Sequence, residues 1–163
     1  MVKDRLLVKR EGDFTYPIVF RKDFLGLSQE IEKLQNKGKK ICVVTDENVA
    51  PLYLEQVKKQ LEQGGKEVFT YILPPGEENK NLEQIQGIYE YLIQNHFDRK
   101  DMLAALGGGV AGDMTGFAAA TYLRGIDFIQ IPTTLLAQVD SSIGGKTGVD
   151  FDQYKNMVGA FHM

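Results

Sequence analysis

Three consecutive glycines after a short apolar run form the stretch of this sequence best suited to binding a ligand. Residues 103–106 are apolar, and a run of this length that ends in glycine is typical of a strand buried on both faces. Glycine has no Cβ, so a ligand can approach the backbone closely, and the first N–H groups of the next helix can bind a phosphate. The alternative is a turn that needs glycine for packing alone, and a lone glycine cluster does not decide between the two. The predicted pyrophosphate cradle comprises Gly107, Gly108, Gly109, Val110 and Gly112.

Two other predicted loops carry side chains that suit a nucleotide. Asp46 could accept hydrogen bonds from ribose hydroxyls, and its alternative role is to cap the helix that begins near Asn48. Glu77 and Lys80 lie three residues apart in a loop opened by proline and glycine. They could bind the ribose and the polar rim of a nucleotide, and their alternative is a solvated turn.

Polar groups also follow the glycine turn and a later strand. Asp113 lies near the start of a predicted helix, where the helix dipole favours an ionised carboxylate. A carboxylate beside a pyrophosphate is unfavourable unless it binds a hydroxyl group or orders the glycine turn. Thr133 and Thr134 offer two hydroxyls at a strand end, and helix capping is their alternative role.

The last third of the chain is poor in cations, so each of its three basic residues invites a specific explanation. Residues 102–163 hold three of the nineteen Lys and Arg residues. Two lysines near an Asp and an Asn suit a small, anionic, hydroxyl-rich substrate. Arg124 could bind a phosphate or a carboxylate, or it could be the usual cation at a helix end. The predicted substrate set is Asp140, Lys146, Lys155 and Asn156.

Composition and charge exclude several classes of protein. Of 163 residues, 43% are hydrophobic and 25% are charged, so the chain is not expected to be disordered. The net charge of −3 and the absence of a long basic run argue against nucleic-acid binding. A single cysteine, Cys42, favours a reducing cytoplasm and an inert buried thiol. Residues 102–123 are long enough for a membrane span, but their glycines and Asp113 argue against one. With only two histidines and no Cys/His cluster, the chain is also poorly supplied with metal ligands.

The hydrophobic pattern predicts an α/β fold with a mostly parallel, Rossmann-like sheet, helices on both faces and an N-terminal β-hairpin. In such sheets ligands bind beyond the carboxyl ends of the strands, where the loops at 46–48, 75–80, 107–113 and 132–134 should meet. Asn48 and Asn81 are predicted helix caps, and residues 144–148 are predicted to form a loop. Strands are predicted at 2–9, 16–20, 41–45, 68–73, 103–106 and 127–131, and helices at 27–34, 48–64, 82–92, 110–123 and 135–141. Residues 156–161 are either another strand or an unfinished element.

Several motifs closely resemble 3-dehydroquinate synthase, a family of NAD-dependent enzymes of the shikimate pathway. The resemblance is clearest from residue 75 to residue 161, and its most specific part is the long block from Pro132 through Gly-Gly-Lys-Thr. The glycine run alone is shared with related metal-dependent alcohol and glycerol dehydrogenases. The motifs that carry the resemblance are Gly-Gly-Gly-Val-Ala-Gly-Asp at 107–113, Arg124-Gly125, Pro-Thr-Thr-Leu-Leu-Ala-Gln-Val-Asp-Ser-Ser at 132–142, Gly-Gly-Lys-Thr-Gly-Val at 144–149 and Lys-Asn-Met-Val-Gly-Ala-Phe at 155–161.

The resemblance implies a role for each matching residue. It implies substrate binding and catalysis at Asp140, Lys146 and Asn156, and it implies that Arg124 reaches the substrate phosphate of the neighbouring subunit in a homodimer. The NAD contacts that it implies are Asp46, Asn48, Pro75, Gly76, Glu77, Glu78, Asn79, Lys80, Gly108, Gly109, Val110, Ala111, Gly112, Asp113, Thr133, Thr134, Lys146 and Lys155.

Two departures from the family pattern are modest and one is large. Asp150 stands where Asn is common, and Gln153-Tyr154 replaces the usual Leu-Gly. The family continues beyond the position of Met163 into a helical domain that holds Zn²⁺ or Co²⁺ through a Glu and two His, so no metal ligand is expected in residues 1–163. We therefore expect a single NAD-binding domain that does not turn over alone. The alternatives are a polyol dehydrogenase, another sugar-phosphate cyclase, or a nucleotide-binding domain without catalysis.

Overall fold

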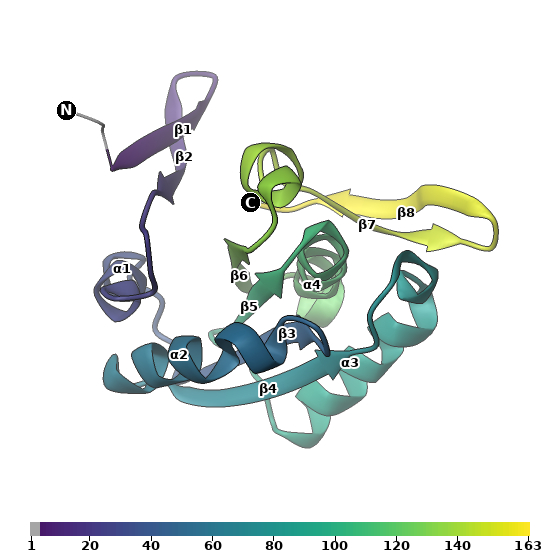
Figure 1. Ribbon diagram of the computed structural model, residues 1–163, viewed down its shortest axis with the longest axis horizontal. Helices are drawn as coiled ribbons and strands as arrows, with labels where there is room; N and C mark the ends of the chain where they lie inside the picture. Colours follow the sequence, from purple (N-terminus) through teal and green to yellow (C-terminus); the bar gives the residue numbers. More distant parts are fainter. Residues whose placement is uncertain (1–3) are drawn as a thin grey trace.

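The computed structural model describes residues 4–163, apart from the side chain of Phe14, and is built around a four-stranded parallel sheet (Figure 1). The strands are β3 (Lys40–Asp46), β4 (Glu67–Leu73), β5 (Met102–Gly107) and β6 (Asp127–Pro132), in the spatial order β4-β3-β5-β6. All six residues of β5 are buried, as its uninterrupted apolar sequence predicts for a central strand. The predicted α/β class with a parallel sheet is confirmed.

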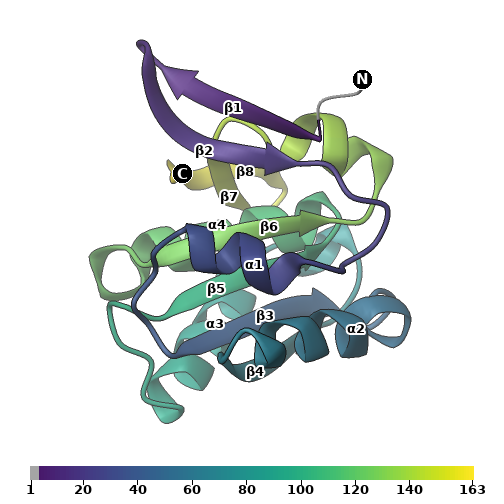
Figure 2. The same ribbon diagram turned by 90° about the vertical axis from the view of Figure 1, so that its left-hand side faces the viewer.

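Helices cover both faces of this sheet (Figure 2). Successive side chains of β3 point to opposite faces and pack against different helices. On one face, Ile41 and Val43 pack with Val57 and Leu61 of α2 (Ala50–Gln63), and α1 (Leu27–Lys33) covers the same side. On the other face, Cys42 and neighbouring side chains pack against α3 (Leu82–Gln94) and α4 (Gly109–Thr121). Burial raises the pKa of the Cys42 thiol to about 12, which agrees with an inert buried thiol.

Two antiparallel hairpins lie outside the main sheet. β1 (Arg5–Arg10) pairs with β2 (Asp13–Val19), which confirms the N-terminal hairpin. β7 (Lys146–Phe151) pairs with β8 (Tyr154–Phe161), and β7 packs against α4 on the side away from the sheet (Figure 1). Because α4 is covered on two sides, most of its residues from Ala111 to Ala119 are buried.

The local predictions are partly right. Asn81 caps α3 by accepting a hydrogen bond from the N–H of Gln84 at 3.1 Å. The prediction that Asn48 caps α2 is wrong, because Val49 is the N-cap residue and has no side-chain cap bond. The predicted loop at 144–148 is also wrong in part, since residues 146–148 belong to β7, where they pair with residues 159–161 of β8 across the hairpin.

The two predicted helices that flank β6 depart from regular α geometry. The helix predicted to run to residue 123 ends at Thr121 and passes into a 3₁₀ turn, η2 (Tyr122–Arg124). The helix predicted at 135–141 is mainly π-helical, as η3 (Ala137–Ser141). A further 3₁₀ turn, η1 (Glu77–Asn79), lies between β4 and α3. Within residues 4–163, no helix combines the length and the apolar character that a membrane span needs.

Candidate functional site

The four predicted loops meet at one edge of the sheet, because parallel strands end on the same side. Asp46 at the end of β3 is paired with Leu73 at the end of β4, and Gly107 at the end of β5 is paired with Pro132 at the end of β6. A hydrogen bond of 2.9 Å from the N–H of Thr133 to the carbonyl of Gly107 ties two of the loops together. The carboxyl edge is therefore a shared platform.

The glycine turn presents the amino end of α4 at this platform. Gly108 is the N-cap residue, and the first helical hydrogen bond runs from the N–H of Gly112 to the carbonyl of Gly108 at 3.0 Å. The N–H groups of Gly109, Val110 and Ala111 precede that bond, so α4 offers them no acceptor, and they can bind an anion. This is the arrangement expected of a phosphate cradle.

Packing also favours glycine at two of these positions. A Cβ on Gly108 would lie 3.2 Å from Cγ2 of Thr134, and a Cβ on Gly109 would lie 3.1 Å from Oγ of Ser141. Both distances are tighter than ordinary side-chain contacts, so neighbouring side chains already use part of the space that glycine leaves. Packing therefore accounts for part of the glycine preference in this turn, and the cradle interpretation stays a prediction.

Ser141 is a candidate that sequence reasoning missed. Its Oγ is buried against Gly109 and has no hydrogen-bond partner among the described residues. A buried hydroxyl without a partner is unfavourable unless a ligand or water satisfies it. Its position beside free N–H groups fits a ligand rich in acceptor oxygens, such as a nucleotide diphosphate. The only signal in the sequence was its place directly after Asp140.

Lys80 is buried, which excludes the solvated-turn alternative for this residue. It is 4% exposed, and its Nζ donates to Oδ2 of Asp113 and to Oδ1 of Asn156, each at 2.7 Å. The three residues come from the loop before α3, from α4 and from β8. Lys80 therefore joins the loop at 75–80, which is predicted to contact the cofactor, to the β7–β8 hairpin, which carries the predicted substrate residue Asn156. Glu77 is exposed, as the solvated-turn alternative predicts, and it faces Lys155 at 3.9 Å.

Asp113 is held by this lysine rather than by the end of its helix. It is the fifth residue of α4 and lies beyond the first turn, where the dipole acts most strongly. Burial raises the pKa of Asp113 above its usual value, and nearby Glu77 and Asp150 add to the rise, while the hydrogen bond and the charge of Lys80 oppose it. The short bond to the ammonium group is the contact of an ionised carboxylate.

The predicted substrate residues share a cleft of about 510 Å³ with Asp113. Asp140 from η3, Lys146 from β7 and Asn156 from β8 line it, and Ser141 lies among them. A cleft that combines two carboxylates, an ammonium group and a carboxamide suits a polar, hydroxyl-rich anion. Lys155 does not line this cleft, since its side chain extends beside Glu77 instead.

Two other predicted contacts already hold backbone groups. Oδ1 of Asp46 accepts from the N–H groups of Asn48 at 2.8 Å and of Val49 at 3.0 Å, so Asp46 plays the capping role considered as its alternative. Its other oxygen, Oδ2, faces the glycine turn, 3.6 Å from where a Cβ on Gly107 would lie. Oγ1 of Thr134 accepts from the N–H of Ala137 at 3.2 Å and thereby caps the helical turn that follows it.

Arg124 lies apart from these residues, at the opposite end of α4. It is exposed, and both Leu123 and Arg124 adopt left-handed backbone conformations, with φ of 51° and 71°. Consecutive left-handed residues other than glycine are unfavourable and often mark a functional turn. The structure thus brings most predicted residues to one edge of the sheet and leaves Arg124 outside.

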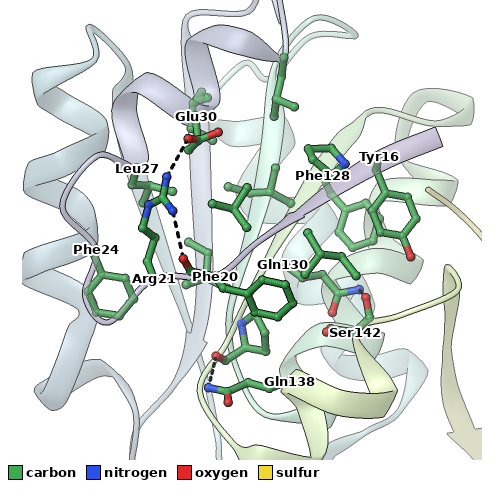
Figure 3. A pocket seen from close by; sticks show the side chains of 18 of the residues that line it. Tyr16, Phe20, Arg21, Phe24, Leu27, Glu30, Phe128, Gln130, Gln138 and Ser142 are labelled. Atoms are coloured by element: carbon green, nitrogen blue, oxygen red, sulfur yellow. Dashed lines mark hydrogen bonds and ion pairs between the residues drawn. The ribbon is translucent and has the colours of Figure 1, made fainter. Parts of the chain in front are cut away.

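A second hollow of about 520 Å³ lies between β2, α1, β6 and η3 (Figure 3). Phe20, Phe24 and Phe128 contribute aromatic lining, and Arg21 faces Glu30 across it at 3.5 Å. None of the predicted site residues lines it.

Metal chemistry has no support within the described part of the chain. Residues 4–163 contain no group of three or more His, Cys, Asp and Glu side chains arranged to hold a metal ion.

Comparison with known proteins gives a consistent result. A protein-family model described as 3-dehydroquinate synthase N-terminal matches residues 70–163. The 3-dehydroquinate synthase of Ruminiclostridium cellulolyticum is 52% identical over 148 residues, which are 91% of this chain and 41% of that protein. The chain thus spans about two fifths of the length of this relative.

Solved structures give the same answer for the fold. A crystal structure of 2-deoxy-scyllo-inosose synthase, complexed with carbaglucose-6-phosphate, NAD⁺ and Co²⁺, matches with a TM-score of 0.77 and 27% identity, over 83% of this chain and 38% of the other. ValA, a 2-epi-5-epi-valiolone synthase from Streptomyces hygroscopicus subsp. jinggangensis 5008 with NAD⁺ and Zn²⁺ bound, matches with a TM-score of 0.78 and 29% identity, over 95% of this chain and 42% of the other.

Proposed function

This chain belongs to the 3-dehydroquinate synthase N-terminal family, and on that premise we propose that it is the NAD-binding domain of a 3-dehydroquinate synthase. The whole enzyme would convert 3-deoxy-arabino-heptulosonate 7-phosphate to 3-dehydroquinate and phosphate. The observation that carries the proposal is the single platform where the amino end of α4 meets the cleft of Asp140, Lys146 and Asn156. A nucleotide at the first and a sugar phosphate in the second would lie side by side.

The cofactor would be held mainly by backbone groups. The free N–H groups of Gly109, Val110 and Ala111 would bind the diphosphate of NAD, and Oδ2 of Asp46 would accept from a ribose hydroxyl. The unpartnered hydroxyl of Ser141 supports the fit. The remaining proposed contacts are those at 75–80, Asn48, Thr133, Thr134 and Lys155. When bound, NAD supplies reversible acceptance of a hydride from the substrate.

The substrate would be held by side chains. The ammonium group of Lys146 would attract the anionic substrate, and the carboxylate of Asp140 would accept hydrogen bonds from the substrate's hydroxyls. The carboxamide of Asn156 can both donate and accept hydrogen bonds. Lys80 and Asp113 would fix Asn156 from behind, because both belong to the same hydrogen-bonded set. Holding the substrate in one orientation against the cofactor is the main contribution that these residues can make to the rate.

Two parts of the activity would come from outside one copy of this chain. The described residues do not fit a divalent metal, so the Zn²⁺ or Co²⁺ of the family would be held elsewhere in the whole enzyme. Arg124 is exposed and remote from the cleft of its own chain, which supports a contact with the substrate phosphate of a neighbouring subunit in a homodimer. The family match disfavours a polyol dehydrogenase.

Calorimetric titration of this chain with NAD tests the proposal. We expect saturable binding of one NAD per chain. We also expect no steady release of phosphate when 3-deoxy-arabino-heptulosonate 7-phosphate is added, because residues 4–163 provide no group of side chains arranged to hold the metal. Absence of NAD binding would remove the cofactor assignment. Sustained phosphate release by residues 1–163 would show that the chain holds a complete active site.

A further inference from the structure

Asp150 occupies an irregular part of the β7–β8 hairpin, directly across from a proposed substrate residue. Val149 pairs with Val158 and Phe151 pairs with Tyr154, so a single residue of β7 faces three residues of β8. Asn156 is the middle one of these three and adopts a left-handed conformation with φ of 54°. Bulges of this kind bend a strand and redirect a side chain, and they are frequent beside active sites.

Three hydrogen bonds connect Asp150 to the buried lysine and to Asn156. Oδ1 of Asp150 accepts from the backbone N–H of Asn156 at 2.7 Å, and the N–H of Asp150 donates to the carbonyl of Lys80 at 2.8 Å. Nζ of Lys80 then donates to Oδ1 of Asn156 at 2.7 Å. The backbone and the side chain of Asn156 are thus fixed from two directions by a closed set of three residues.

Asn156 lines the cleft and Asp150 does not. We infer that Asp150 is a positioning residue, which holds the left-handed backbone of Asn156 so that its carboxamide faces the substrate. The inference rests on the proposed function for the identity of that substrate. The anchoring itself rests on the three contacts alone. Asp150 acts through Asn156 and does not touch the substrate.

Three variants separate this role from a general role in hairpin stability. Asp150→Ala removes the acceptor, and Asp150→Asn keeps an acceptor oxygen while removing the charge. Asp152→Asn removes a charge two residues away, on an exposed residue of the same hairpin, and serves as the matched control. Each variant is measured in two ways. One is amide hydrogen exchange at Asn156 in this chain, and the other is steady-state kinetics of the full-length enzyme.

With Asp150→Ala we expect hydrogen exchange at the Asn156 amide to accelerate at least tenfold, because the amide loses a hydrogen bond to a charged group. For the same reason we expect the KM for 3-deoxy-arabino-heptulosonate 7-phosphate to rise about tenfold. The affinity for NAD should not change. Asp150→Asn and Asp152→Asn should both stay within about twofold of the unmodified protein, in line with the retained acceptor and the exposed site. An unchanged exchange rate or an unchanged KM in Asp150→Ala would overturn the inference. Equal losses in Asp150→Ala and Asp150→Asn would also overturn it. An unmodified enzyme without turnover would instead refute the proposed function, and the exchange measurement would still test the anchoring.

Discussion

The glycine turn and the β7–β8 hairpin contribute to the same platform in opposite ways. The turn belongs to a fully buried strand and a largely buried helix, and it offers backbone N–H groups. The hairpin lies outside the main sheet, most residues of β8 are exposed, and it offers the side chains of Lys146 and Asn156. The proposed cofactor half of the site is therefore built into the core, whereas the proposed substrate half depends on long-range side-chain bonds.

Removal of the buried lysine between the two regions is expected to have the largest effect. Lys80→Met would leave the carboxylate of Asp113 partly buried without its counter-ion and would free Asn156. We expect a loss of about 3 kcal/mol in the free energy of unfolding, measured by urea denaturation. The control is Lys58→Met, whose exposed pair with Glu62 at 3.8 Å should contribute less than about 0.5 kcal/mol. Equal small losses in both variants would show that the hairpin is held without Lys80.

A side chain in the glycine turn should abolish the backbone half of the site. Gly109→Val would place its branched side chain against Oγ of Ser141 and over the free N–H groups. We expect NAD affinity to fall by about 100-fold, or roughly 2.7 kcal/mol, by calorimetry, while circular dichroism shows a folded chain. Ala120→Val, at the far end of α4, is the matched control and should bind NAD normally. Unchanged affinity in Gly109→Val would leave packing as the sole reason for this glycine.

A variant of Arg124 tests whether the glycine turn and the β7–β8 hairpin of one chain are sufficient for the proposed substrate site, or whether a neighbouring subunit contributes. Arg124→Ala should leave NAD affinity unchanged and shift the free energy of unfolding by less than about 0.5 kcal/mol, because the side chain is exposed. If the whole enzyme forms the proposed homodimer, its KM for the sugar phosphate should rise about tenfold through loss of a charge-assisted contact. A normal KM would favour the alternative of an ordinary cation at a helix end.

The smallest effect is a dependence of stability on pH at the junction of the two regions. Burial raises the pKa of Asp113 in the folded chain, so the folded state binds this proton more tightly than the unfolded state does. The contribution of Asp113 to stability should therefore fall as pH rises from 3.8, the ordinary pKa of this side chain, through the higher folded pKa. The difference in unfolding free energy between the unmodified chain and Asp113→Asn, followed by urea denaturation between about pH 3 and pH 7, should decline over that range. An increase with pH would mean that Lys80 outweighs burial.

The sequence predicted the scaffold well because the scaffold depends on local patterns. The apolar run before Gly107 and the alternation of strands and helices are properties of neighbouring residues, and they led to the correct sheet and the correct edge. The burial of Lys80 was not predictable in this way. Its two partners lie 33 and 76 residues further along the chain, and a Pro-Gly loop alone indicates a solvated turn.

The wrong predictions of local structure arise where contacts beyond the predicted segment decide the outcome. Asn48 has the right residue type for a cap, yet Val49 is the N-cap residue, and Asp46 holds the backbone N–H groups of Asn48 and Val49 just before α2. Residues 146–148 read as a glycine-rich loop, but pairing with β8 extends them into a strand. The π-helical geometry that brings Ser141 beside Gly109 has no local sequence signature at all.

The two carboxylate oxygens of Asp46 have separate neighbours, and this division limits the effect that a substitution of Asp46 can have. Because Oδ1 accepts from the backbone N–H groups just before α2 and Oδ2 faces the glycine turn, a replacement that lacks both oxygens would disturb that segment of backbone together with the proposed ribose contact. Asparagine would keep one acceptor and offer a donor in place of the other. Asp46→Asn would thus change the proposed nucleotide contact and leave the turn before α2 in place.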